Sequence, residues 1–237
     1  MNFFGHALLA HRDEATRGPI RAEFVLGAML PDFASMLRTR PPSATLDALT
    51  AGLSFHHQTD DAFHGSQSFL EFSRLASSFL SDRGVPRGTA RAVAHVGVEL
   101  LLDAAFAREN AANEAYLSAV ACALTERVRS YIHWQRNDAS ERFQHLCHSL
   151  RHRGRYQENP ASELVAERLR NILADRPRLA MDERGLSVVR EWVDSARSQI
   201  TSGAPQLLRE VELRLPPRPV PLAPSPVPSP ELPSSLA

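Results

Sequence analysis

Residues 46–64 read LDALTAGLSFHHQTDDAFH, and this stretch predicts a helix together with the direction in which it faces. Its leucines recur at intervals of three and four residues, the spacing of an apolar stripe that packs against a core. The stripe then continues through three titratable residues, His56, Asp60 and His64. Residues four apart are neighbours on one helix face, about 5–6 Å apart at Cβ. We therefore expect these polar side chains to point inward, as the leucines do.

A second segment, residues 92–107 (AVAHVGVELLLDAAFA), is apolar or small everywhere except at His95, Glu99 and Asp103. A helix that is apolar nearly all round is a buried helix. Burying an unpaired carboxylate is costly, so Glu99 and Asp103 need partners, and the segment contains no arginine to supply them. The pattern predicts a bound metal cation, or histidines held on a neighbouring helix.

Both patterns also have an ordinary structural interpretation. His56, Asp60 and His64 would then line a solvated helix face, as scattered polar residues usually do. Glu99 and Asp103 would form salt bridges with arginines elsewhere in the chain. These alternatives leave unexplained why a stripe that faces the core becomes titratable within one helix.

Two further polar residues interrupt apolar surroundings. His6 lies within FFGHALLA, and Asp32 follows FVLGAMLP just after the expected end of a helix. Alone, they would be a core histidine and a turn or cap aspartate. Combined with the two stripes, they complete the mixture of His, Asp and Glu that Mn²⁺, Fe²⁺ and Zn²⁺ sites use, whereas Mg²⁺ and Ca²⁺ prefer oxygen ligands alone. Our candidate metal ligands are His6, Asp32, His56, Asp60, His95, Glu99 and Asp103, with Mn²⁺ favoured over Zn²⁺ and Fe²⁺.

The composition limits the kind of protein. The 237 residues carry 27 basic and 27 acidic side chains, so no net charge attracts the chain to nucleic acid or to an anionic membrane. Every one of these basic residues is arginine, which excludes a Schiff-base lysine and a P-loop lysine. The two cysteines lack a C-x-x-C spacing and favour a reducing, cytoplasmic setting. No apolar run reaches the roughly 18 residues of a transmembrane helix.

The whole chain predicts an all-α fold, because Ala, Leu, Arg and Glu dominate at helical spacing and strand-type alternation is scarce. We expect a helical catalytic core over 1–136, further helices packing on it over 137–214, and a disordered Pro-rich tail over 215–237. The expected helices are 2–10, 20–30, 44–63, 66–81, 87–108, 110–135, 139–152, 160–174, 182–201 and 203–213.

The first 110 or so residues resemble the bacterial acyl carrier protein phosphodiesterases, which are related to the HD phosphohydrolases. The resemblance rests on MNFFGHALLA, LGAMLPDF, GLSFHHQTDDAFHGSQSF and ARAVAHVGVELLLDAAFARE. It implies a compact, HD-like helical phosphohydrolase that releases 4′-phosphopantetheine from holo acyl carrier protein. By the resemblance, the metal ligands are His6, Asp32, His56, Asp60, Glu99 and Asp103.

The sequence departs from that family at three positions. His64 and Glu99 stand where the family has aspartates, Ala104 stands where it has a histidine, and the chain contains no adjacent His-Asp dyad. The His-x-x-x-Asp-x-x-x-His of residues 56–64 and the His-x-x-x-Glu at His95 also resemble zinc-dependent phospholipase C. Both resemblances imply metal-dependent hydrolysis of a phosphodiester, and they differ in substrate and in the number of metal ions.

The expected mechanism is metal-assisted hydrolysis, in which the cation lowers the pKa of a bound water towards 7 and polarises a phosphoryl oxygen. His57 and His64 are candidates for a general acid, or for residues that orient the ligands, because imidazole titrates near neutral pH. A different class also remains open, a metal-free helical scaffold or binding protein, which would tolerate the departures from the family.

A basic segment, ERFQHLCHSLRHRGRYQ, suggests where a protein substrate would dock. Acyl carrier proteins are strongly acidic as a class, so an enzyme that acts on them needs a basic surface near its metal. The candidate partner-binding residues are Arg142, Arg151, Arg153 and Arg155. Cys147 falls on the apolar face of the same helix, and we interpret it as an inert core residue rather than a nucleophile.

Overall fold

The structure, a computed structural model, describes residues 1–216 and is built almost entirely of helices. The all-α prediction is confirmed for this part of the chain. The elements are α1 (Phe3–Ala15), α2 (Ala22–Met36), β1 (Ser43–Ala44), α3 (Asp47–His64), α4 (Gln67–Asp82), α5 (Arg87–Phe106), α6 (Asn110–Ala123), α7 (Glu126–Arg129), β2 (Ile132–His133), α8 (Ala139–Arg153), α9 (Ser162–Leu173), the short 3₁₀ helix η1 (Pro177–Leu179) and α10 (Glu183–Arg214).

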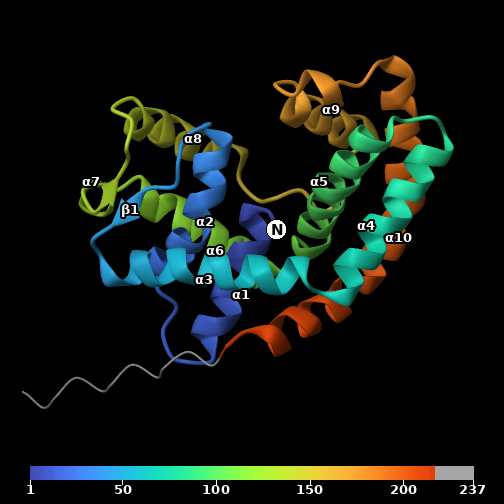
Figure 1. Cartoon of the computed structure of the whole chain (residues 1–237). Helices are drawn as coiled ribbons and strands as arrows, with labels where there is room; N and C mark the ends of the chain where they lie inside the picture. Colours follow the sequence, from blue (N-terminus) through green and yellow to red (C-terminus); the bar gives the residue numbers. More distant parts are fainter. Residues whose placement is uncertain (217–237) are drawn as a thin grey trace, which may run out of the picture.

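The helices form two packed groups that meet at the N-terminal end of α1 (Figure 1). In the first group, α2 packs against α1, α3 and α6, and α8 packs against α6. In the second, the long α10 packs along α4, α5 and α9. Because α1 contacts both α3 and α5, its first residues lie between the two helices that carry the predicted polar stripes.

A glycine pair sets the crossing of α2 and α3. A Cβ on Gly27 would lie 2.4 Å from the Leu49 carbonyl oxygen, and a Cβ on Gly52 would lie 2.3 Å from that of Phe24. No other residue fits at either position, so the two backbones approach closely. His56 follows Gly52 by about one turn, and its ring reaches the carbonyl oxygen of Ala28 at 2.9 Å.

Helix α2 corrects the sequence prediction, which ended a helix at residue 30. The structure continues the helix through Pro31 to Met36, although a proline within a helix costs about 3 kcal/mol. The residues around Pro31 are buried against α1, α3 and α6, and this packing outweighs the lost hydrogen bond. Asp32 therefore projects from a helix rather than from a turn.

Two other predicted boundaries were wrong. The helix expected over 110–135 ends at Ala123, because Thr125 caps the separate helix α7 by accepting a hydrogen bond from the Val128 N–H. The following residues form β2, which pairs antiparallel with β1. Conversely, the break expected near residue 202 is absent, because Gly203 fits closely against the Phe72 ring and α10 runs on through Pro205.

None of the helices within residues 1–216 combines the length and the apolar character needed to cross a lipid bilayer. The Pro-rich segment, predicted to be disordered over 215–237, lies outside the described residues from 217 onward.

Candidate metal centre

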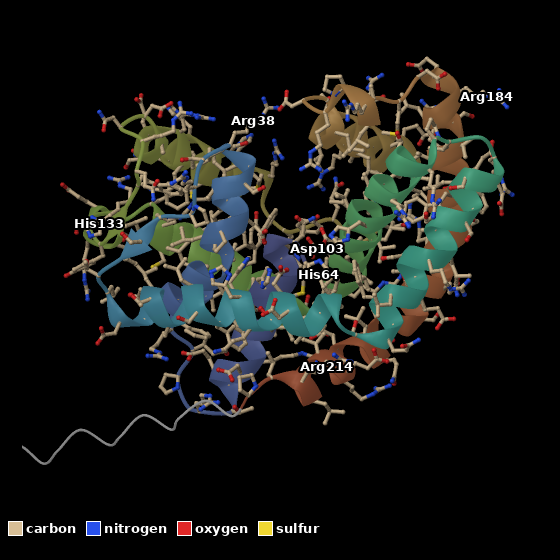
Figure 2. The ribbon with its side chains drawn as sticks, viewed as in Figure 1. Arg38, His64, Asp103, His133, Arg184 and Arg214 are labelled. Atoms are coloured by element: carbon tan, nitrogen blue, oxygen red, sulfur yellow. The ribbon has the colours of Figure 1, made fainter. Side chains whose placement is uncertain are left out.

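Two groups of potential ligands meet at the junction of α1, α2, α3 and α5. The inner cluster comprises His6 of α1, Asp32 of α2 and His56 of α3. The outer cluster comprises His64 of α3 with His95 and Glu99 of α5. Within each cluster, one potential ligand atom of every residue lies within 4.8 Å of the others. Figure 2 shows His64 and Asp103 in this central region, between the two helix groups.

The inner cluster is deeply buried. His6 is fully inaccessible, His56 is 7% exposed, and their rings stack with centroids 3.9 Å apart. The Nε2 atom of His6 lies 3.7 Å from Asp32 Oδ2 and 3.8 Å from Asp60 Oδ1. The stripe on α3 thus turns inward at His56, as its spacing predicted.

Hydrogen bonds fix the tautomers of both histidines. Nδ1 of His56 must donate to the Ala28 carbonyl oxygen, which can only accept. The Thr59 hydroxyl donates within its own helix, where the Phe55 carbonyl oxygen lies 2.9 Å away. The hydroxyl oxygen therefore accepts from Nδ1 of His6, also at 2.9 Å. In both rings Nε2 is left as a bare lone pair, the form that binds a metal.

The electrostatics of the inner cluster favour the binding of a cation. Burial lowers the pKa of His56 to about 4 and that of His6 well below its usual value, so both rings are neutral. Burial also raises the pKa of Asp32 well above its usual value. Among residues 1–216, neither His6 Nε2 nor Asp32 Oδ2 has a hydrogen-bond partner. Buried polar atoms are rarely left unpaired, and a cation would satisfy all of these lone pairs together.

The outer cluster satisfies itself by hydrogen bonding. Nδ1 of His64 donates to the Asp60 carbonyl oxygen at 2.9 Å, and its Nε2 lies 3.2 Å from Glu99 Oε1. Nε2 of His95 lies 3.3 Å from the same oxygen, and the two imidazoles stack in parallel, 4.9 Å apart. Burial opposes protonation, but the hydrogen bonds to Asp60 and Glu99 outweigh it and raise the pKa of His64 to about 9. His64 is therefore an imidazolium at neutral pH.

Asp60 lies between the two clusters. Its Oδ1 faces His6, and its Oδ2 lies 3.4 Å from His64 Nδ1. The amino group of Met1 donates to Oδ1 at 2.8 Å and lies 3.2 Å from Glu99 Oε1. Burial opposes ionisation, yet the bonds to His64 and to this ammonium hold the pKa of Asp60 well below its usual range. Asp60 is thus a carboxylate that both clusters can share.

Asp103 lies on α5 one turn beyond Glu99 and is fully buried. Its Oδ1 accepts a hydrogen bond from the Gly5 N–H at 3.0 Å, and among the described residues its Oδ2 has no partner. Burial raises its pKa to about 8. Within residues 1–216 neither Asp103 nor Glu99 forms an ion pair with arginine, so the alternative of a structural arginine salt bridge is not supported.

The remaining predicted residues are dispersed. His57 is exposed, and its ring meets that of His56 edge-on at 5.4 Å. Arg142 donates to the Leu37 carbonyl oxygen at 2.7 Å. Arg151 is exposed on α8, whereas Arg153 and Arg155 line a cavity of about 520 Å³ that reaches towards Phe3, Tyr156 and Arg168. The four arginines therefore do not form one patch.

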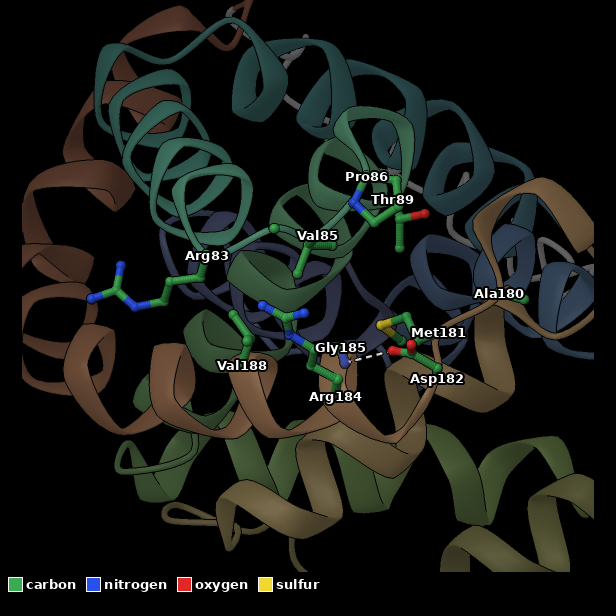
Figure 3. Close-up of a pocket in the computed structure, with 11 residues that line it drawn as sticks. Arg83, Val85, Pro86, Thr89, Ala180, Met181, Asp182, Arg184, Gly185 and Val188 are labelled. Carbon is green, nitrogen blue, oxygen red and sulfur yellow. Dashed lines mark hydrogen bonds between the residues drawn. The ribbon is translucent and has the colours of Figure 1, made fainter.

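Thr59 was missed by the sequence analysis, although it lies inside the quoted stretch. A threonine on a helix carries no signal of its own, and its role depends on α1 packing beside it. Another cavity, of about 280 Å³, lies where the turn after α4 meets the start of α10 (Figure 3). Its lining includes no residue of either cluster, and Asp182 there caps α10 through the Gly185 N–H.

Comparison with protein-family models, with curated proteins and with solved structures found no match for this chain.

Proposed function

We propose that this protein is a metal-dependent phosphodiesterase whose inner cluster, together with Asp60, holds a divalent cation. The observation that carries the proposal is the convergence of two bare imidazole lone pairs, on His6 and His56, with the carboxylates of Asp32 and Asp60. Nitrogen and oxygen ligands in this mixture suit Mn²⁺, Zn²⁺ or Fe²⁺. We favour Mn²⁺, in line with the resemblance to acyl carrier protein phosphodiesterases.

The chain's own groups would orient the ligands and manage the protons. A cation bound there would supply a water of lowered pKa and polarise a phosphoryl oxygen. Ala28 and Thr59 hold the two imidazoles in the ligating tautomer. His64 holds a proton at neutral pH and lies at the partly exposed edge of the site. It is therefore the best placed residue to protonate the oxygen that leaves phosphorus.

The proposed substrate is holo acyl carrier protein, with 4′-phosphopantetheine as the released product. Support comes from the cavity of about 520 Å³ beside the N-terminal end of α1. Its lining combines apolar side chains, such as Phe3 and Leu164, with Arg153, Arg155 and Arg168, which suits an anionic substrate that carries a long neutral arm. The HD-like fold and the cytoplasmic location belong to the same proposal.

A second candidate is a zinc-dependent phospholipase C-like activity. The outer cluster favours it, because a stacked His64 and His95 beside Glu99 give a second potential cation site that shares Asp60 with the first. Two cations about 3.5–4 Å apart stabilise both the attacking and the leaving oxygen in many phosphodiesterases. In that case a phospholipid would be the substrate.

Metal content and substrate preference together test the proposal. Full-length protein would be purified in chelator and reloaded with Mn²⁺, Zn²⁺ or Fe²⁺. Hydrolysis of bis(p-nitrophenyl) phosphate, holo acyl carrier protein and phosphatidylcholine would then be measured. We expect bound metal and cleavage of the first two substrates. The control variant His133→Gln changes an exposed histidine outside both clusters and should behave as the wild type does. Cleavage of the phospholipid without cleavage of the carrier protein would favour the second candidate. Protein that binds none of these metals would be a scaffold.

A further inference from the structure

A basic groove runs between α4 and α5 and ends at the outer cluster. It is an open cavity of about 640 Å³, and its lining includes Arg74 of α4 together with Arg87, Arg91 and His95 of α5. His95 belongs to both features, because it lines the groove and also contacts Glu99 at 3.3 Å. The groove is therefore continuous with the candidate metal centre.

Helix α5 explains this continuity. Arg87, Arg91, His95, Glu99 and Asp103 follow one another at intervals of four residues, so each lies beside the next on the helix surface, about 6 Å further along the axis. The row is exposed and basic at its start and buried and acidic at its end. A single helix thus leads from a cationic entrance to the carboxylates of the site.

The cationic side chains of the groove have no internal partners. Among residues 1–216, none of Arg74, Arg87 and Arg91 forms an ion pair, whereas many other arginines do. Asp82 is the one acidic side chain among the lining residues, which leaves an excess of two positive charges. Serines of α4 supply hydroxyl donors, and the buried Ser73 Oγ has no hydrogen-bond partner within the described chain.

We infer that this groove binds a second phosphate group of the substrate, at a position separate from the phosphodiester that is cleaved. This inference rests on the proposed diesterase activity and names a substrate class other than holo acyl carrier protein, whose prosthetic group carries only the phosphate that is cleaved: a phosphodiester that carries a further phosphate. One guanidinium group can donate to two phosphate oxygens at once, and serine hydroxyls add neutral donors. Unpaired cations in a concave surface also concentrate anions near the site.

The first test uses inorganic pyrophosphate and metal-free, full-length protein in chelator, with binding measured by calorimetry at low ionic strength. We expect the Arg87→Gln/Arg91→Gln variant to bind pyrophosphate at least tenfold more weakly than the wild type. The matched control is Arg127→Gln/Arg129→Gln in α7, which removes the same two charges at the far side of the molecule (Figure 1). No binding by the wild type, or equal weakening in both variants, would overturn the inference.

A second test uses the metal-loaded enzyme. The p-nitrophenyl ester of thymidine monophosphate would be compared with the same ester carrying another phosphate on its sugar. We expect the additional phosphate to raise kcat/KM in the wild type, and the Arg87→Gln/Arg91→Gln variant to lose that advantage. If the wild type cleaves both esters at the same rate, the inference about the groove is wrong, whereas the proposed function stands. If neither ester nor any other diester is cleaved, the proposed function fails, and the pyrophosphate titration still decides whether the groove binds phosphate.

Discussion

The inner and outer clusters contain the same kinds of residue in two different electrostatic states. In the inner cluster, burial keeps the imidazoles of His6 and His56 neutral, and within residues 1–216 Nε2 of His6 has no hydrogen-bond partner. In the outer cluster, His64 is protonated and held between Asp60 and Glu99. No residue of the inner cluster is therefore positively charged, although the Met1 ammonium lies beside it on Asp60, whereas the outer cluster contains a charged imidazolium.

Residue type alone therefore does not define a metal site. A cation that enters the inner cluster binds imidazole Nε2 atoms that carry no proton. A cation entering the outer cluster must first displace the proton of His64, and metal affinity falls when a ligand has to be deprotonated. We therefore expect the inner cluster to bind the first metal ion.

The largest expected effect comes from replacing an inner ligand. His56→Gln removes one of the two bare lone pairs, and we expect a loss of bound metal and a fall in diesterase activity of at least about 100-fold, since even residues that only orient a ligand are worth 10–100-fold. His64→Gln should retain the first metal ion. Metal content measured by mass spectrometry of both variants makes the comparison. Loss of the first ion from His64→Gln, with retention in His56→Gln, would reverse our order of the clusters.

Asp103→Asn tests the unpaired buried carboxylate. We expect activity to be abolished, because the change removes a charge that supports the cation, while the fold persists because the amide oxygen can still accept from the Gly5 N–H. The pKa of Asp103 is raised to about 8 in the folded protein, so its contribution to the stability of the metal-free protein falls as the pH rises from about 4 to about 8.

The asparagine variant should lack this dependence and should be at least as stable as the wild type at neutral pH. Chemical denaturation of the metal-free proteins across this range provides the measurement. A large loss of stability in the variant would show instead that Asp103 is held by a structural ion pair.

His64→Gln probes the outer cluster through its pH dependence. The folded-state pKa of His64, about 9, lies above its unfolded value of 6.5. Its stabilising contribution is therefore complete below pH 6.5 and is lost as the pH rises through 9. At pH 6 we expect the variant, free of metal, to be less stable than the wild type by roughly 1–2 kcal/mol, after allowance for its partial exposure. The difference should vanish near pH 10. Parallel stability curves for the two proteins would contradict the proposed ion pairs.

The smallest effect concerns the surface. Reversing Arg151 and Arg153 to Glu should weaken turnover of holo acyl carrier protein several-fold at low salt, and the loss should shrink as salt screens the charges. Cleavage of bis(p-nitrophenyl) phosphate should change little. Equal losses on both substrates would show that these arginines serve the catalytic centre, through the cavity that Arg153 lines, rather than the docking of a partner.

The helical class, the inward face of α3 and the burial of most of α5 can be read from the amino-acid pattern alone. These follow from periodicity, because apolar residues repeating every three or four positions must share one side of a helix. The types of candidate ligand were also readable, since polar residues stand out within apolar stripes. Glu99 and Asp103 were identified in this way. In the structure Glu99 lies beside His64, His95 and the Met1 ammonium, whereas among the described residues Asp103 has only the Gly5 N–H, on its Oδ1.

The division of those residues into two clusters, and the proton that each of them carries or lacks, depend on how the helices pack. The glycine crossing of α2 and α3 brings Ala28 to His56, the packing of α1 brings Thr59 to His6, and the continuation of α2 through Pro31 directs Asp32 into the site. A pKa depends on burial and on neighbours within a few ångströms. Those neighbours are distant along the chain, so no local pattern in the sequence encodes that His64 is charged while His6 and His56 are neutral.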